Sequence, residues 1–183
     1  MRKYGMLTCL DIETTFKKDD AYFYNGNNQL VSIGFKTNSG KEDYLWFYHK
    51  EKEPTENGKE TLQNILNSTK LLIGHNIKFD LAWLYGSGFT YNNRVYDTMV
   101  VEYLLARGVH CDLSLDGSCK RRKVKQKKKH LIESQMKSGV GMDNIPYKLI
   151  EEYGRGDVDC TYELAMEQCK LLEVDINEFN WNT

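Results

Sequence analysis

The stretch Met-Leu-Thr-Cys-Leu-Asp-Ile-Glu-Thr-Thr, residues 6–15, decides how the rest of the chain is interpreted. Residues 6–12 form a short apolar run, which predicts a buried strand that ends at an acidic pair. Because side chains alternate across a strand, Asp11 and Glu13 face the same side and converge on one point. Acidic pairs at strand ends are commonly just solvated, so this pair alone does not decide a function.

Further strands and helices follow in a regular order. Segments that are short and apolar, or rich in β-branched and aromatic residues, are predicted strands at residues 30–35, 44–48, 71–74 and 94–96. Apolar residues recur at helical spacing at residues 62–66, 79–84, 99–104 and 158–172. Hairpin strands followed by alternating helices and strands predict an α/β fold, in which helices cover both faces of a mixed sheet.

Length and composition indicate an ordinary globular protein. A chain of 183 residues fits one domain, and 40% hydrophobic residues with two prolines exclude a disordered or fibrous class. We expect a single domain over residues 1–183. Residues 120–129 have almost no apolar side chains, so the surrounding region, about 112–144, is predicted to be an irregular insertion with at most one exposed helix.

The cysteines and the N-terminus bear on location. The five cysteines are odd in number and contain no C-x-x-C pair, which argues against a disulfide framework and a structural zinc site. The apolar segment that follows Lys3 ends at Asp11, and it is too short and too acidic for a signal peptide or a membrane span. We therefore expect reduced thiols, an intracellular location and no membrane association.

Two more acidic positions follow predicted elements. Asp80 lies shortly after the fourth strand, and Asn76 would share its helix face if the helix began at Asn76 or just before. Tyr153 and Asp157 also stand four residues apart, although two glycines between them weaken a helical interpretation. Each pair has a structural alternative: a helix cap with a surface acid, or a core tyrosine with an acid at a helix start.

Together these residues resemble the three exonuclease motifs of the DnaQ-like superfamily, in the order and approximate spacing of that family. The motifs are Asp11-Ile12-Glu13-Thr14-Thr15, Gly74-His75-Asn76-Ile77-Lys78-Phe79-Asp80 and Tyr153-x-x-x-Asp157-x-Asp159. Tyrosine in the third motif is the DEDDy form. Residues 96–105 also resemble the stretch after the second motif in proofreading domains of family A DNA polymerases. Three motifs in order are far more specific than any one of them.

The resemblance implies a ribonuclease H-like fold with a mixed five-stranded sheet. It also implies metal-dependent removal of nucleoside monophosphates from the 3′ end of single-stranded DNA or a frayed 3′ end, as in proofreading during DNA replication. Two divalent cations, Mg²⁺ or Mn²⁺, would be held by Asp11, Glu13, Asp80 and Asp157, and Tyr153 would orient the attacking water. The chemistry agrees, because such cations prefer hard oxygen ligands and together activate water and stabilise the leaving oxygen.

Other residues are expected to contact the nucleic acid. They are Thr14, Thr15, Phe16 and Asn76 near the motifs, and Lys120, Arg121, Arg122 and Lys123 in a basic run. Residues 120–130 hold eight of the 25 Lys and Arg although the net charge is −1, so the remaining chain is distinctly acidic. The run is either a phosphate-binding arm or a solvated loop. Base stacking by Phe16 and Tyr147 competes with ordinary packing, and His75 is expected to be hydrogen-bonded rather than a metal ligand.

Two other functions share these motifs. One is an RNA exonuclease of the ribonuclease D kind, and the other is a catalytically silent nucleic-acid-binding domain, against which the retention of all four carboxylates argues. The sequence has no room for polymerase palm and fingers. The nuclease would therefore be free-standing, a separate subunit beside a DNA polymerase, or an excised domain, and it would act in the cytoplasm, a host cytoplasm if it is phage-encoded.

Overall fold

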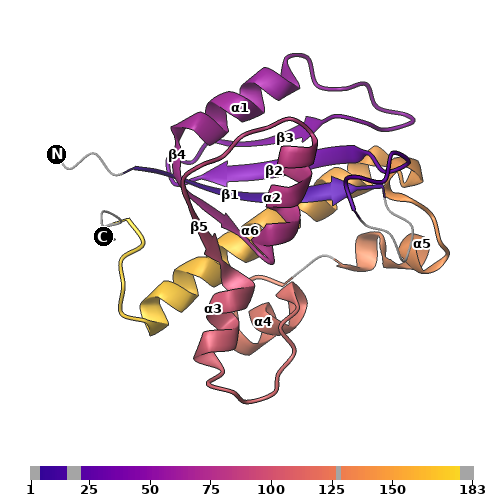
Figure 1. The fold of residues 1–183 in the computed structure, drawn as a ribbon. Coiled ribbons are helices and arrows are strands. Elements are labelled where there is room, and N and C mark those ends of the chain that lie inside the picture. The colour runs from indigo at the N-terminus through magenta and orange to yellow at the C-terminus, as the bar shows by residue number, and fades with distance from the viewer. Residues whose placement is uncertain (1–4, 16–21, 127–128, 178–183) are drawn as a thin grey trace.

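The computed structural model describes residues 5–15, 22–126 and 129–177, and it places five strands in one sheet of order β3-β2-β1-β4-β5 (Figure 1). The strands are β1 Met6–Thr14, β2 Leu30–Thr37, β3 Glu42–Trp46, β4 Thr69–Gly74 and β5 Arg94–Asp97. β1, β2 and β3 are antiparallel, whereas β4 runs parallel to β1 and β5 runs parallel to β4. The predicted mixed sheet and each predicted strand are confirmed.

Two strand boundaries differ from the prediction. β1 continues to Thr14, so Asp11 and Glu13 lie within the strand and are not its last residues, because β2 stays paired with β1 beyond them. β3 ends at Trp46, because the next two backbone N–H groups both donate to the carbonyl of Val31 and the regular ladder stops there.

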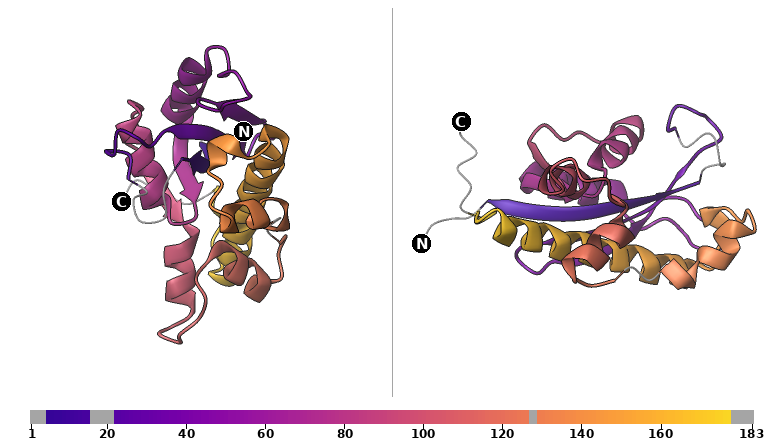
Figure 2. Two further views of the ribbon diagram at one scale, coloured as in Figure 1. Left: turned by 90° about the vertical axis from the view of Figure 1, so that its right-hand side faces the viewer. Right: turned by 90° about the horizontal axis from the view of Figure 1, so that it is seen from below.

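Helices form a layer on each face of the sheet (Figures 1 and 2). They include α1 Gly58–Ser68, α2 Ile77–Gly86, α3 Thr98–Leu105 and α6 Tyr147–Leu171. α1 and α2 cover one face, and the long helix α6 crosses the other face beneath β1 and β2. The expected helices on both faces are therefore present.

Alternation along β1 decides which side chains meet which helix. Leu10 and Ile12 enter the core with residues of α1 and α2, whereas Cys9 packs with residues of α6. Asp11 and Glu13 have the same parity as Cys9, so both carboxylates point to the α6 side.

α6 runs unbroken through Gly154 and Gly156, so the glycines of the third motif do not interrupt the helix. Gly154 lets the helix approach the sheet, because a Cβ there would lie 2.6 Å from the hydroxyl of Tyr44. That hydroxyl hydrogen-bonds with Ser32 at 2.8 Å and donates to the carbonyl of Ile150 at 3.3 Å. Tertiary packing thus outweighs the helix penalty of about 1 kcal/mol for a glycine.

The segment 112–144 is more regular than the sequence predicted. It contains α4 Leu115–Arg122, η1 Lys129–Leu131, α5 Glu133–Lys137 and η2 Met142–Asn144. The exposed helix is α5, but Leu115 and Cys119 of α4 are buried together with residues of α6, and Ile132 and Met142 are buried in a further cluster. The expected irregular insertion is corrected accordingly: isolated apolar residues anchor it without giving a periodic signal.

Two further features concern the cysteines and the helices. All five cysteines carry free thiols, and four of them are buried. None of the helices in residues 5–15, 22–126 and 129–177 combines the length and the apolarity that crossing a bilayer requires.

Candidate active site

Three carboxylates from the first and third motifs meet between β1 and α6. One carboxylate oxygen each from Asp11, Glu13 and Asp157 lies within 4.8 Å of the others. Asp157 is 2% exposed and Glu13 is 8% exposed, whereas Asp11 is half-buried. Negative charges this close repel each other where water cannot screen them, so the group fits a divalent cation that prefers oxygen ligands.

Asp80, on α2, lies near Asp11 of this group. Burial, and then the charge of Asp11, raises the pKa of Asp80 well above its ordinary value. β4 pairs with β1 only as far as Cys9, so the β1 edge beyond it is free to donate from the backbone of Ile12 to the Asp80 carboxylate. Three of the four predicted metal ligands thus form the 4.8 Å group, and the fourth lies beside Asp11.

Tyr153 lies one helical turn before Asp157 on α6, and it is buried. Burial, followed by the charge of Asp157, raises the pKa of the Tyr153 phenol above its ordinary value. The two side chains also hydrogen-bond with each other. Tyr153 is therefore protonated at neutral pH, and its hydroxyl lies next to the acidic group.

Asn76 does not share a helix face with Asp80, which corrects the prediction. α2 begins at Ile77, and Asn76 before it has the left-handed φ of 59° and ψ of 44° without a side-chain cap. Its Oδ1 is buried and has no hydrogen-bond partner among the described residues. A left-handed turn of this kind is not visible in side-chain spacing.

Asp97 holds the start of α2, a role that sequence reasoning missed. Its carboxylate accepts hydrogen bonds from the backbone N–H groups of Asn76 at 3.0 Å and Ile77 at 3.1 Å. It also accepts from Met99 at 2.9 Å as the N-cap of α3, so one carboxylate fixes two helix starts. An aspartate directly before an apolar helix was the available signal.

The threonines after the acidic pair lie at the end of β1. Thr14 is 2% exposed, and the β1–β2 register shifts between it and Glu13. Thr15 is bonded to Gln29 just before β2, because its Oγ1 accepts from the backbone N–H of Gln29 at 2.7 Å and its own N–H donates to the Gln29 carbonyl at 2.9 Å. Phe16 lies outside the described residues.

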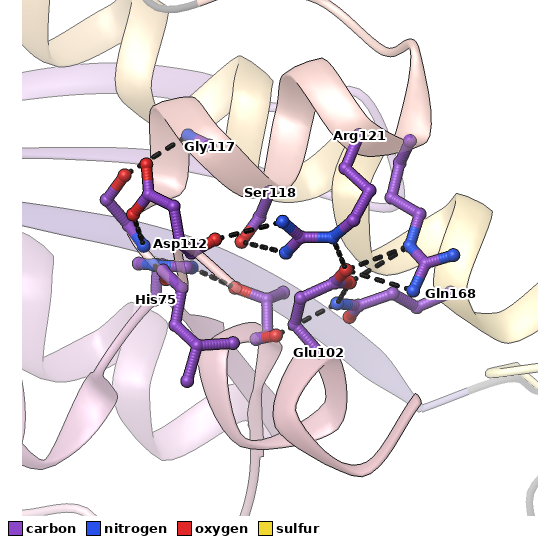
Figure 3. A network of polar contacts seen from close by, with 11 residues as sticks. His75, Glu102, Asp112, Gly117, Ser118, Arg121 and Gln168 are labelled. Carbon is purple, nitrogen blue, oxygen red and sulfur yellow. Dashed lines mark hydrogen bonds and ion pairs between the residues drawn. The ribbon is translucent and has the colours of Figure 1, made fainter. Parts of the chain in front are cut away.

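His75 and Tyr147 both have structural surroundings. His75 Nδ1 hydrogen-bonds with Thr98 at 2.8 Å and Nε2 with the carbonyl of Leu113 at 2.9 Å, which confirms a hydrogen-bonded histidine (Figure 3). The ring of Tyr147 packs edge-on against Trp46 at 6.1 Å, which is the packing alternative to base stacking.

The two arginines of the basic run are occupied inside the protein. Arg121 Nε and Arg122 Nη2 lie 2.8 and 2.9 Å from the carboxylate of Glu102, which is fully buried on α3 (Figure 3). Gln168 of α6 donates to the same carboxylate at 3.0 Å. Their charges compensate a buried acid, and the expectation that Arg121 and Arg122 bind nucleic acid stays a prediction that these ion pairs disfavour.

Lys120 and Lys123 of the run lie at the surface. Lys120 pairs with Asp116 one turn earlier at 2.7 Å, and its side chain remains 64% exposed. Lys123 is exposed just after α4, and residues 127 and 128 lie outside the described residues. A phosphate contact by this run would therefore come from its lysines.

Comparison with known proteins places this site in a family. A sequence model described as 3′–5′ exonuclease matches residues 8–173, which include the acidic group, Asp80 and Tyr153. The chain belongs to this 3′–5′ exonuclease family. The protein is therefore an exonuclease. Among curated proteins, no significant match is found.

Solved structures share the fold of this exonuclease. One described as the apo form of the nuclease has a TM-score of 0.62 at 19% identity, covering 93% of this chain and 74% of that chain. Brucella melitensis NrnC with bound Mg²⁺ has a TM-score of 0.59 at 20% identity, covering 91% and 73%. The POL domain of Pol1 from M. smegmatis, in complex with DNA primer-template and dNTP, has a TM-score of 0.52 at 13% identity and covers 96% and 26%. The implied ribonuclease H-like fold is confirmed, and the exonuclease spans about a quarter of the polymerase chain.

Proposed function

We propose that this exonuclease hydrolyses the last phosphodiester bond at the 3′ end of single-stranded DNA and releases nucleoside monophosphates with the help of two divalent cations. The observation that supports this most strongly is the acidic group of Asp11, Glu13 and Asp157, whose oxygens lie within 4.8 Å of one another. The family model, 3′–5′ exonuclease, gives the reaction and the end of the strand at which it takes place.

The donor set suits Mg²⁺ or Mn²⁺. Asp11, Glu13, Asp80 and Asp157 offer the hard oxygen ligands that these ions prefer and would hold them. When bound, such cations activate a water and offset charge on the leaving oxygen. The shared fold of NrnC with bound Mg²⁺ supports the same class of ion.

The remaining residues would position the reactants. A phenol has a pKa of about 10, so Tyr153 would hold the attacking water by a hydrogen bond and would not take its proton. Thr14 would contact the terminal nucleotide through its backbone or hydroxyl. Asn76, whose buried amide oxygen lies at the start of α2, would support the second motif.

Tyr153→Phe is expected to lower kcat by about 10- to 100-fold with KM near the wild-type value. The change removes one hydroxyl and keeps the ring, so it affects the positioned water more than substrate binding. Single-turnover rates at saturating DNA measure the effect. Tyr147→Phe is the matched control, because the same change on the same helix should leave the rate unaltered. Equal rates for both variants would contradict the role of Tyr153.

DNA is proposed as the substrate because the second motif and the stretch after it resemble proofreading domains of family A polymerases. The Pol1 structure, which contains a DNA primer-template, shares the fold. A ribonuclease D-like activity on RNA is the competing outcome, and both need the same acidic group.

The deciding experiment compares 5′-labelled DNA and RNA, each single- and double-stranded, with Mg²⁺, Mn²⁺ or EDTA. We expect single-stranded DNA to be shortened stepwise from the 3′ end and EDTA to stop the reaction. Faster shortening of RNA would replace DNA by RNA in the proposal. Binding without shortening under every metal condition would indicate a silent nucleic-acid-binding domain.

Two broader expectations stay predictions. A separate DNA polymerase subunit as partner is testable by co-purification with the cell's polymerases. A cytoplasmic site of action is supported by the five free thiols, which suit a reducing compartment.

A further inference from the structure

A cleft of 820 Å³ lies at the end of β1, the strand that carries Asp11 and Glu13. Thr14 and Thr15 line it, and Thr14 directly follows Glu13 in the strand. Its other walls come from residues 25–29, between β1 and β2, and from residues 136–144, around the end of α5. A nucleic-acid strand with its 3′ end at the carboxylates would have this cleft beside it.

Amides are the most numerous polar side chains of the cleft. The loop wall carries Asn25, Asn27, Asn28 and Gln29, and Asn144 lies in the opposite segment. Each amide offers both a donor and an acceptor, which is the pattern that hydrogen-bonds with the edges of nucleobases. Recognition of this kind is typical of single-stranded nucleic acid, whose base edges are free.

The charged residues of the lining are already paired. Lys137 lies 2.8 Å from Glu133, and Asp143 lies 3.5 Å from Lys50. Charge-driven phosphate binding draws on available Lys and Arg side chains, whereas base edges are also read by neutral donors and acceptors. A cleft with neutralised charges therefore suits bases better than phosphates.

Apolar side chains of the cleft can contact the face of a base, in addition to the amides that can bond its edge. Tyr48, Met136 and Val140 of the lining are 40%, 42% and 36% exposed. Large apolar groups gathered in one cleft mark a binding surface, and an aromatic ring can stack on any base.

The loop wall is held in place before any ligand arrives. Gln29 is fixed to Thr15 by two backbone-mediated hydrogen bonds, and Phe23 packs so closely on α2 that a Cβ at Gly86 would lie 2.1 Å from its ring. The side chains of Asn27 and Gln29 are exposed, and within the described residues neither amide group has a hydrogen-bond partner. Both amides are available to a ligand.

We propose that this cleft binds one nucleobase of the substrate, upstream of the 3′-terminal nucleotide. Asn27 and Gln29 hydrogen-bond its edge, and Tyr48 contacts its face. The position relative to the 3′ end rests on the proposed function. Affinity then depends on the presence and identity of the base at a fixed distance from that end.

Equilibrium binding in EDTA tests the cleft apart from catalysis. Fluorescein-labelled single-stranded octanucleotides, with one abasic residue moved stepwise from the 3′ end, are titrated with the full chain and followed by anisotropy. DNA and RNA series are both used. We expect an affinity loss of about 10-fold at one position or two adjacent positions, and little loss elsewhere.

Three variants assign that loss to the cleft. The double variant Asn27→Ala, Gln29→Ala should lose the preference among the four bases at the sensitive position, and Tyr48→Ala should lose the abasic effect. Asn92→Ala, at another exposed asparagine, is the matched control and should behave like wild type.

The outcomes separate this inference from the proposed function. A position-dependent loss in EDTA supports the cleft even if no oligonucleotide is ever shortened. No measurable binding, equal affinity for every abasic position, or an unchanged pattern in both cleft variants would overturn it even if the exonuclease ladder appears as expected.

Discussion

Asp157→Ala is expected to lower kcat by at least about 100-fold, since even changes to groups that only support metal ligands cost 10- to 100-fold. Asp157 is 2% exposed, and its carboxylate lies within 4.8 Å of those of Asp11 and Glu13. Without a metal, that crowding costs free energy in the folded state. The shape-matched Asp157→Asn should therefore unfold at a higher temperature than the wild type in EDTA, although it is inactive.

Rates on 5′-labelled DNA and thermal unfolding with and without Mn²⁺ measure both effects. Mn²⁺ should stabilise the wild type by binding the folded state and should stabilise the Asp157 variants much less. Asp159→Asn is the matched control two residues later, because Asp159 pairs with Lys36 and Lys125 outside the acidic group. An activity loss of the same size in Asp159→Asn would contradict the assignment, as would full Mn²⁺ stabilisation of Asp157→Asn.

Patterns within one element could be predicted from the sequence. Asp11 and Glu13 were placed together by strand alternation, and Tyr153 and Asp157 by helical spacing, and both relations hold in the structure. The two pairs meet in one site because β1 and α6 pack against each other. Asn76 shows the limit, since its left-handed backbone is held from outside by Asp97, 21 residues later.

Contacts between distant side chains could not be predicted in the same way. A basic run reads as a solvated or phosphate-binding segment because composition counts charges without their partners. Glu102 lies about 20 residues before Arg121 and Arg122, and nothing in their local pattern shows that the acid is fully buried between α3, α4 and α6. A folded-state ion pair thus changes the interpretation of the run (Figure 3).

The double variant Arg121→Gln, Arg122→Gln is expected to lower the free energy of unfolding by about 3–5 kcal/mol at pH 7. It leaves the buried carboxylate of Glu102 with the amide of Gln168 but without a positive charge. Breaking a buried pair on one side costs more than the pair contributes, because the remaining charge is stranded. Urea denaturation of wild type and variant measures the difference.

The pH dependence of that difference has a definite sign. Burial alone would raise the pKa of Glu102, but hydrogen bonds from Arg122, Gln168 and Arg121 outweigh it and hold the pKa below the ordinary value of 4.5. A carboxyl whose pKa is lowered by folding contributes stability above its unfolded pKa and loses it as pH falls through the folded pKa. The gap between wild type and variant should therefore be full at pH 7 and shrink below about pH 4.

The salt dependence of DNA binding separates this structural role from a phosphate-binding one. The double variant Lys120→Gln, Lys123→Gln also removes two positive charges, but from exposed positions. Its free energy of unfolding should therefore change by less than about 0.5 kcal/mol. If these lysines contact phosphates, the slope of log affinity against log salt should flatten by up to about 0.7 for each contact. The arginine variant should keep the wild-type slope despite its instability. A flattened slope with unchanged stability in the arginine variant would mean that Arg121 and Arg122 leave Glu102 to bind phosphate.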